Sequence, residues 1–117
     1  MHGLEHLITN LTPIHALCDL TDISGAYFNQ HRNLKGNSGI FIFETDEYGV
    51  GIVESIYTNI ELLLKESVSL LKSCGCQHGC PRCIHSPYCS SENKELDKNE
   101  TIKLIEAIQN ETNNLPP

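Results

Sequence analysis

The sequence predicts an α+β domain made of three helices, a small antiparallel sheet and one cysteine-rich loop. Three segments carry apolar residues at helical spacing, two short segments have the composition of strands, and five of the six cysteines lie close together. A chain of 117 residues has the length of one domain. We expect residues 1–110 to form that domain and residues 111–117 to be a flexible tail.

The first predicted helix covers residues 2–17. Its apolar residues are three or four positions apart and share one face: Leu4, Leu7, Ile8, Leu11, Ile14 and Leu17. Pro13 has no amide hydrogen to donate to the preceding turn, so a break or kink is predicted near the middle of this helix. Cys18 follows the helix. With His15 nearby it has the residue types of a nucleophile pair, but a small buried thiol is the expected role.

Two strands are predicted next, over residues 22–28 and 39–44. The second is the clearer of the two, because β-branched and aromatic residues alternate from Ile40 to Phe43. The residues between the strands are polar and rich in Gly and Asn, which is typical of a loop. This arrangement favours an antiparallel pair.

A long helix is predicted over residues 51–73. Its apolar residues follow the helical repeat: Val53, Ile56, Tyr57, Ile60, Leu63, Leu64, Val68 and Leu71. A last helix is predicted to begin near Asp97, whose carboxylate can cap the first turn with Glu100 as its capping-box partner. The apolar face of that helix consists of Ile102, Leu104, Ile105 and Ile108.

The cysteine-rich loop covers residues 74–91 and contains Cys74, Cys76, Cys80, Cys83 and Cys89. The first residues have neither the cationic nor the apolar segment of a secretory signal, so we expect no disulfide framework. The spacing of Cys80-Pro81-Arg82-Cys83 lets two thiolates bind one ion at about 2.3 Å. Thiolates favour zinc, with an iron–sulfur cluster and a redox dithiol as the alternatives. We expect one structural Zn²⁺ held by four of the five cysteines.

Three of these cysteines are expected ligands in every arrangement, namely Cys76, Cys80 and Cys83. The fourth ligand is Cys74 or Cys89. Side chains two residues apart in an extended chain point to opposite sides, which disfavours Cys74, but Gly75 can bend the chain and remove that objection. His78 and His85 are also within reach of the ion. We expect both on the loop surface, because the thiolates suffice.

The first helix contains a further pattern, His2-Gly3-Leu4-Glu5-His6, which matches the H-x-x-E-H signature of inverted zinc proteases. The function it suggests is a stand-alone zinc-dependent hydrolase that uses His2, Glu5 and His6. The sequence points to no third ligand for such a site. We therefore favour an interface in which this helix packs on the long helix, with Glu5 and His6 near its edge.

Charge and composition exclude several classes of function. Eight basic residues against fifteen acidic ones give a net charge of −7. We expect weak or no DNA binding by the isolated domain, because phosphate binding requires a basic face. No G-x-x-x-x-G-K-[ST] phosphate loop occurs, and no apolar run is long enough for a bilayer. We expect a cytoplasmic protein without membrane contact, with an acidic protein-interaction module as another candidate function.

Several strings of residues together carry a family resemblance. The loop contains Cys76-x3-Cys80-Pro81-x-Cys83-Ile84-x-Ser86-Pro87-x-Cys89, followed by Asn93 and Leu96-Asp97-Lys98. Upstream are His2-x2-Glu5-His6, Cys18-Asp19-x2-Asp22-Ile23-x-Gly25 and, ahead of the long helix, Gly49-Val50-Gly51. These strings resemble the C-terminal zinc-binding domain of MrfA-type helicases, which are superfamily 2 DEAD/DEAH-box DNA helicases.

The resemblance implies a parent enzyme that uses ATP to unwind DNA in DNA repair, with its helicase motor upstream of this domain. It implies that the domain alone performs no catalysis. The implied partners are the motor domains of the same parent chain and, through them, DNA. The implied role is to stabilise the helicase C-terminus and to guide the DNA strand that leaves the motor.

Overall fold

The structure is a computed structural model that describes residues 1–16, 18–46, 51–89 and 91–113. The elements of this part of the chain are α1 (His2–His15), the 3₁₀ turn η1 (Leu20–Asp22), β1 (Ile23–His31), the 3₁₀ turn η2 (Arg32–Leu34), β2 (Asn37–Glu44), α2 (Ile52–Thr58), α3 (Ile60–Ser73) and α4 (Lys98–Asn113). The predicted α+β class is confirmed. No helix in the described ranges is both long and apolar enough to cross a membrane.

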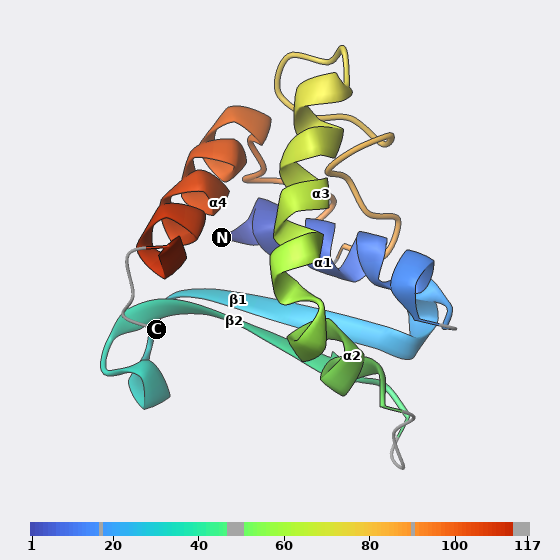
Figure 1. The fold of residues 1–117 in the computed structure, drawn as a ribbon, viewed down its shortest axis with the longest axis vertical. Helices are drawn as coiled ribbons and strands as arrows, with labels where there is room; N and C mark the ends of the chain where they lie inside the picture. The colour runs from blue at the N-terminus through green and yellow to red at the C-terminus, as the bar shows by residue number, and fades with distance from the viewer. Residues whose placement is uncertain (17, 47–50, 90, 114–117) are drawn as a thin grey trace.

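Helix α1 lies in the middle of the fold, with the sheet on one side and α3 and α4 on the other (Figure 1). Its predicted apolar face is buried from Leu4 to Leu11, while Ile14 is exposed. Its polar face is buried as well: His2, Glu5, His6 and Thr9. This burial corrects the expectation that Glu5 and His6 lie at an edge, and it arises because α1 is covered on both sides.

Strands β1 and β2 form an antiparallel pair in which Ile23 faces Glu44 and Phe28 faces Gly39. Both strands are longer than predicted, because an irregularity between Phe28 and His31 lets pairing continue to His31 and Asn37. Gly25 is required in β1. A Cβ at this position would collide with Glu5 Oε1 and lie 2.8 Å from Glu5 Cγ. The missing side chain therefore lets α1 approach the sheet closely.

The helix predicted over residues 51–73 is two helices, α2 and α3, which meet at Asn59. The Asn59 backbone has φ −107° and ψ 17°, and its side-chain amide donates to the Ser55 carbonyl at 2.9 Å. Asn competes in this way with the helical hydrogen bonds, which the apolar spacing does not reveal. Tyr57, predicted to lie on the apolar face, is instead exposed.

The ends of two helices also differ from the prediction. Helix α1 continues through Pro13 to His15, because Pro13 lies in the last turn and removes only one backbone hydrogen bond there. Helix α4 begins after Asp97, whose carboxylate accepts the Glu100 N–H at 2.9 Å as predicted. It runs to Asn113, three residues into the predicted tail. Leu17 and residues 114–117 lie outside the described residues.

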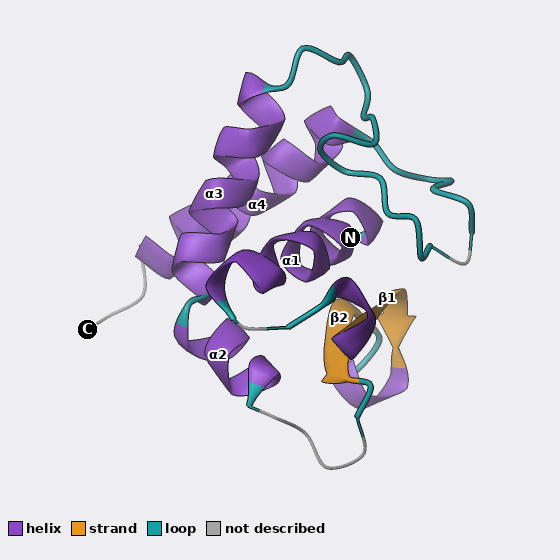
Figure 2. Cartoon of the chain, turned by 90° about the vertical axis from the view of Figure 1, so that its right-hand side faces the viewer, coloured by secondary structure: helices purple, strands orange, loops and turns teal. Residues whose placement is uncertain are grey.

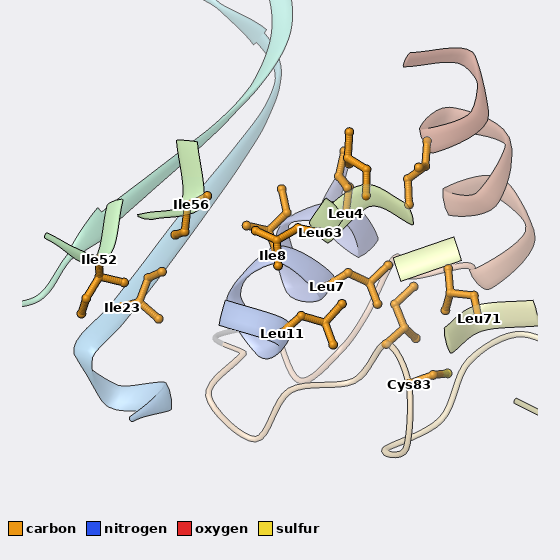
Figure 3. Packing of buried hydrophobic residues seen from close by; sticks show 13 residues of the cluster. Leu4, Leu7, Ile8, Leu11, Ile23, Ile52, Ile56, Leu63, Leu71 and Cys83 are labelled. Atoms are coloured by element: carbon orange, nitrogen blue, oxygen red, sulfur yellow. The ribbon is translucent and has the colours of Figure 1, made fainter. Parts of the chain in front are cut away.

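The hydrophobic core surrounds α1 (Figure 3). Its most deeply buried apolar side chains come from α1, α3, the cysteine loop and α4: Leu7, Leu63, Leu71, Ile84 and Ile105. Cys83 belongs to the same cluster. The cysteine loop is thus anchored in the core by Cys83 and Ile84, which fixes its position relative to α1.

Candidate metal centre

Figure 2 shows the long loop that joins the end of α3 to the start of α4. Four of the five clustered cysteines lie in the first part of this loop, from Cys74 to Cys83. Cys74 follows α3 directly, and its N–H donates to the Leu70 carbonyl at 3.1 Å. A tight turn of the loop is built on the Cys80 carbonyl, which accepts the N–H groups of Cys83 at 3.1 Å and Ile84 at 3.2 Å. This turn brings the thiols of the predicted Cys80-Pro81-Arg82-Cys83 knuckle to the same side.

The sulfur atoms of Cys74, Cys76, Cys80 and Cys83 all lie within 4.8 Å of one another. The Sγ–Sγ distances are 3.5 Å for Cys74–Cys80, 3.6 Å for Cys76–Cys83 and 3.8 Å for Cys80–Cys83. Sulfur atoms on a tetrahedral zinc ion with bonds of about 2.3 Å are about 3.8 Å apart. All four are free thiols, so the donor set and its dimensions fit one zinc ion. We call this group the four-thiol cage.

Lys98, the first residue of α4, is buried against the four-thiol cage. Its Nζ donates to the Cys74 carbonyl at 2.6 Å and the Cys76 carbonyl at 2.8 Å, and lies 3.7 Å from Cys76 Sγ. A fixed ammonium at this place offsets the negative charge of the thiolates. Sequence reasoning gave Lys98 no role, although it belongs to the Leu96-Asp97-Lys98 string of the family resemblance.

The start of α4 holds the loop at further points. The Lys98 N–H donates to the His78 carbonyl at 2.9 Å, and the Asn99 amide donates to the Gln77 carbonyl at 3.2 Å. The His78 ring lies 3.2 Å from the Asp97 carboxylate and is largely exposed. His78 is thus on the loop surface, and neither His78 nor His85 belongs to a group of metal-ligating side chains in the described part of the chain.

The thiols of the cage differ in acidity in the metal-free chain. A hydrogen bond from the Cys76 backbone N–H, followed by the neighbouring thiols, lowers the pKa of Cys74 to about 7. Burial raises the pKa of Cys83 to about 12. Zinc binds the thiolate, so it must displace the proton of Cys83 at any ordinary pH.

Cys89, the fifth clustered cysteine, lies away from the cage. Its Sγ is 3.4 Å from His2 Nε2 and 3.2 Å from Ser91 Oγ. His2, His6 and Cys89 form a second group whose ligand atoms all lie within 4.8 Å of one another. The His2 ring also stacks on Tyr27, with ring centroids 4.4 Å apart. Of the two candidates for the fourth ligand of the cage, the geometry favours Cys74.

The second group lines a cavity of about 440 Å³ between α1, β1 and the end of the cysteine loop. Glu5 lines the same cavity, and burial raises its pKa to about 6. Burial lowers the pKa values of His2 and His6. Burial thus favours the neutral form of both rings, although a buried carboxyl lies beside them.

The polar face of α1 binds carbonyl groups of the cysteine loop. His6 Nδ1 donates to the Ile84 carbonyl at 2.8 Å, and the Asn10 amide donates to the His85 carbonyl at 3.1 Å. Asn93 closes the next part of the loop, since its side chain accepts the Ser86 N–H at 2.7 Å and donates to the Ser86 carbonyl at 3.0 Å. The sequence analysis named His6 and Asn93 as parts of patterns, but it did not find their contacts with the loop or those of Asn10, because no spacing rule links these residues.

The surroundings of Cys18 and His15 do not favour a nucleophile pair. The His15 ring lies 2.6 Å from the Glu66 carboxylate on α3. Cys18 is half-buried beside the core, as expected for a packing residue. Burial, together with the negative charges of Asp22 and Asp19, raises the pKa of its thiol and so opposes nucleophilic chemistry.

Known proteins are similar to this chain in sequence and in fold. A relative in Methanocaldococcus jannaschii, "Uncharacterized protein MJ1572.1", is 42% identical over 110 residues, which are 92% of this chain and 98% of that protein. The Bacillus subtilis "Uncharacterized ATP-dependent helicase YprA" is 23% identical over 82 residues, and the Saccharomyces cerevisiae "ATP-dependent helicase HRQ1" is 22% identical over 107 residues. The matches cover 70% and 84% of this chain, but only 11% of YprA and 10% of HRQ1.

A solved structure, "Crystal Structure of DUF1998 helicase MrfA bound to DNA", has the same fold, with a TM-score of 0.74 and 20% identity. The match covers 92% of this chain and 14% of that helicase. The sequence profile of the MrfA Zn-binding domain family matches residues 4–84 of this chain. The chain therefore belongs to the MrfA Zn-binding domain family, and the metal of its clustered cysteines is zinc.

Proposed function

We propose that this chain is a structural zinc-binding domain that assists the motor of an ATP-dependent DNA helicase. The observation that carries the proposal is a closed site of four thiols within a family whose larger relatives YprA and HRQ1 are helicases. Four protein ligands leave no open position on zinc, which is the arrangement of structural rather than catalytic sites. The partners are the helicase motor domains and, through them, DNA.

Cys74, Cys76, Cys80 and Cys83 are the zinc ligands in this proposal. Support comes from their mutual Sγ distances and from the burial of Lys98 against them. Zinc then joins the end of α3 to the loop, and Lys98 joins the loop to the start of α4. Metal binding supplies folding free energy when the ligands converge only in the folded state. The zinc ion therefore stabilises the arrangement of α1, α3 and α4.

The outer face of the sheet is the surface that we assign to the motor. Three aromatic side chains gather on it, with exposed fractions of 37% for Phe28, 38% for Phe41 and 48% for Phe43. The Phe28 and Phe41 rings are 5.6 Å apart. Exposed aromatic side chains at this density are typical of a protein contact surface. In the DNA-bound MrfA structure the matched region makes up 14% of the helicase chain. The other parts of such a helicase can therefore pack against this face of the sheet.

DNA contact in this proposal comes through the motor. The net charge of −7 opposes direct binding of the isolated chain to phosphates. Free thiols and a thiolate zinc site suit a reducing compartment, so the cytoplasm is the proposed location.

A graft into a helicase relative tests the proposal. The segment of YprA that matches this chain is deleted, and then replaced either by this chain or by this chain with Cys80→Ser and Cys83→Ser. The measurement is ATP-dependent unwinding of a labelled DNA duplex. We expect the deletion to abolish unwinding, the graft to restore it, and the cysteine variant to fail. A zinc-loaded, folded graft that unwinds no better than the deletion would contradict the proposal.

A further inference from the structure

The group formed by His2, His6 and Cys89 is separate from the four-thiol cage and has no role in the proposed function. It joins the first turns of α1 to the far end of the cysteine loop, across 87 positions of sequence. It lines the cavity beside β1, where Glu5 and Tyr27 also lie. We propose that these three side chains bind a second zinc ion.

The separations between the ligand atoms fit a common ion. His2 Nε2 and Cys89 Sγ are 3.4 Å apart. A tetrahedral zinc ion with Zn–N bonds of about 2.0–2.1 Å and a Zn–S bond of about 2.3 Å sets its nitrogen and sulfur ligands about 3.6 Å apart. His2 and His6 are one helical turn apart, and their ring centroids are separated by 4.4 Å. Two imidazoles at this spacing on one helix face can bind one metal ion.

The hydrogen bonds of His6 leave the correct nitrogen available. Its Nδ1 donates to the Ile84 carbonyl at 2.8 Å, so Nε2 of the neutral ring carries the lone pair. Metal-binding histidines in proteins typically donate their other ring N–H to a carbonyl or carboxylate in this way. Nε2 lies 3.7 Å from the Glu5 carboxylate, beyond hydrogen-bond distance. The ring is thus oriented, and its ligand atom has no hydrogen bond of its own.

The hydrogen bonding of His2 is incomplete without a further partner. The residue is 6% exposed, and Nδ1 is buried without a hydrogen-bond partner. Its Nε2 lies 3.4 Å from the Cys89 thiol, a weak donor and acceptor, and the Lys94 backbone also interacts with the ring. A buried ring with so few partners carries a free-energy cost. A metal–Nε2 bond replaces the weak thiol contact of this ring with a stronger one, and a thiolate at Cys89 supplies the negative charge.

The ligand set differs from that of the cage. Two imidazoles and one thiolate suit Zn²⁺ and other late first-row metals. Three protein ligands leave a fourth position for water in the cavity, in contrast to the closed four-thiol cage. An ion here also links the start of α1 to the loop, and so stabilises a contact between distant parts of the sequence.

The test is zinc stoichiometry of the full chain, purified without a polyhistidine tag and dialysed with excess zinc. We expect two zinc ions per chain by elemental analysis, and one after either Cys89→Ser or His6→Ala. The matched controls are Cys18→Ser and His15→Ala, which remove a thiol and an imidazole outside both groups and are expected to keep two ions. One ion in the unmodified chain, or two ions in folded Cys89→Ser, would overturn the inference.

A second measurement identifies the ligand atoms directly. X-ray absorption of the zinc-saturated chain is expected to show both nitrogen and sulfur ligands, and the nitrogen contribution is expected to disappear in Cys89→Ser. Sulfur ligands alone in the saturated chain would also overturn the second site. The double variant Cys80→Ser with Cys83→Ser removes the cage and tests the proposed function, whereas Cys89→Ser tests the second site. A failure of the proposed function can therefore be distinguished from a failure of the second site.

Discussion

The four-thiol cage and the cavity group of His2, His6 and Cys89 both use the cysteine loop but are assembled differently. The cage takes its four thiols from one short stretch between Cys74 and Cys83, closed by a turn on the Cys80 carbonyl. The cavity group joins a helix at one end of the chain to a loop near the other. A local cage tolerates movement of the rest of the fold, whereas the cavity group exists only while α1 is packed against the loop.

The largest expected effect is loss of the cage by Cys80→Ser together with Cys83→Ser. The cage then keeps two thiols, and a hydroxyl replaces the buried Cys83 in the core. Structural zinc binding is worth about 10–16 kcal/mol in small zinc domains, so we expect the loop of residues 74–91 to lose its structure. The helical signal of α3 should largely persist, because its apolar face packs on α1. Zinc analysis and circular dichroism check this, and unchanged cage zinc would contradict it.

The affinity of the cage for zinc is expected to fall steeply on acidification. Binding releases protons from the thiols, so affinity rises with pH and is lost as pH falls. Cys83, with a pKa of about 12, releases its proton on binding throughout the accessible range, whereas Cys74, with a pKa of about 7, does so only below neutrality. The slope of log affinity against pH should therefore be steeper by about one below pH 7 than above it. Competition with a chelator at several pH values measures this slope, and one slope on both sides of pH 7 would contradict it.

Lys98→Met tests the link between the cage and α4. The change leaves the carbonyls of Cys74 and Cys76 without their buried donor, at a cost of about 2–3 kcal/mol in the free energy of unfolding. The matched control is Lys103→Met on the same helix, where the side chain is exposed and the expected cost is under about 0.5 kcal/mol. Urea unfolding of the zinc-loaded chains measures both. Equal costs would show that Lys98 is not a structural link.

Gly25→Ala affects the cavity group through the sheet. The new methyl group would collide with the Glu5 carboxylate, so α1 must move or Glu5 must change its conformation. Overpacking of this kind costs about 1–3 kcal/mol. Gly75→Ala in the cage is the control, since a Cβ there meets no atom within 4 Å. Thermal unfolding compares the two variants, and a smaller loss for Gly25→Ala than for Gly75→Ala would show that close approach of α1 to β1 is unimportant.

Much of the fold follows from local patterns. The apolar spacing in α1, α3 and α4, the alternation in β2 and the Asp97 cap each depend on neighbours within a few residues, and the structure confirms them. The division of the long helix at Asn59 was missed, because one side-chain hydrogen bond to Ser55 decides it and apolar spacing does not report that bond. Helix α4 continues through a polar sequence as far as Asn113, into the segment predicted as a tail.

For the candidate sites too, local spacing could be interpreted from the sequence, whereas contacts between distant residues could not. Cysteine spacing alone indicated a zinc loop with Cys76, Cys80 and Cys83 at its centre, because ligands a few residues apart are constrained by the backbone between them. The alternatives Cys74 and Cys89 could not be separated in this way. In the structure Cys74 lies with the other three thiols at the end of α3, whereas Cys89 lies beside His2 on the first turn of α1.

The sequence by itself therefore determined the α+β class, the zinc loop and the family resemblance, because short-range spacing encodes all three. Only the tertiary structure decided that Lys98 is buried against the cage, that the polar face of α1 is buried, and that His2, His6 and Cys89 meet in one cavity. Those contacts join residues far apart in the chain. Their geometry is fixed by the packing of α1 between the sheet, the loop and α4, and no periodicity in the sequence records it.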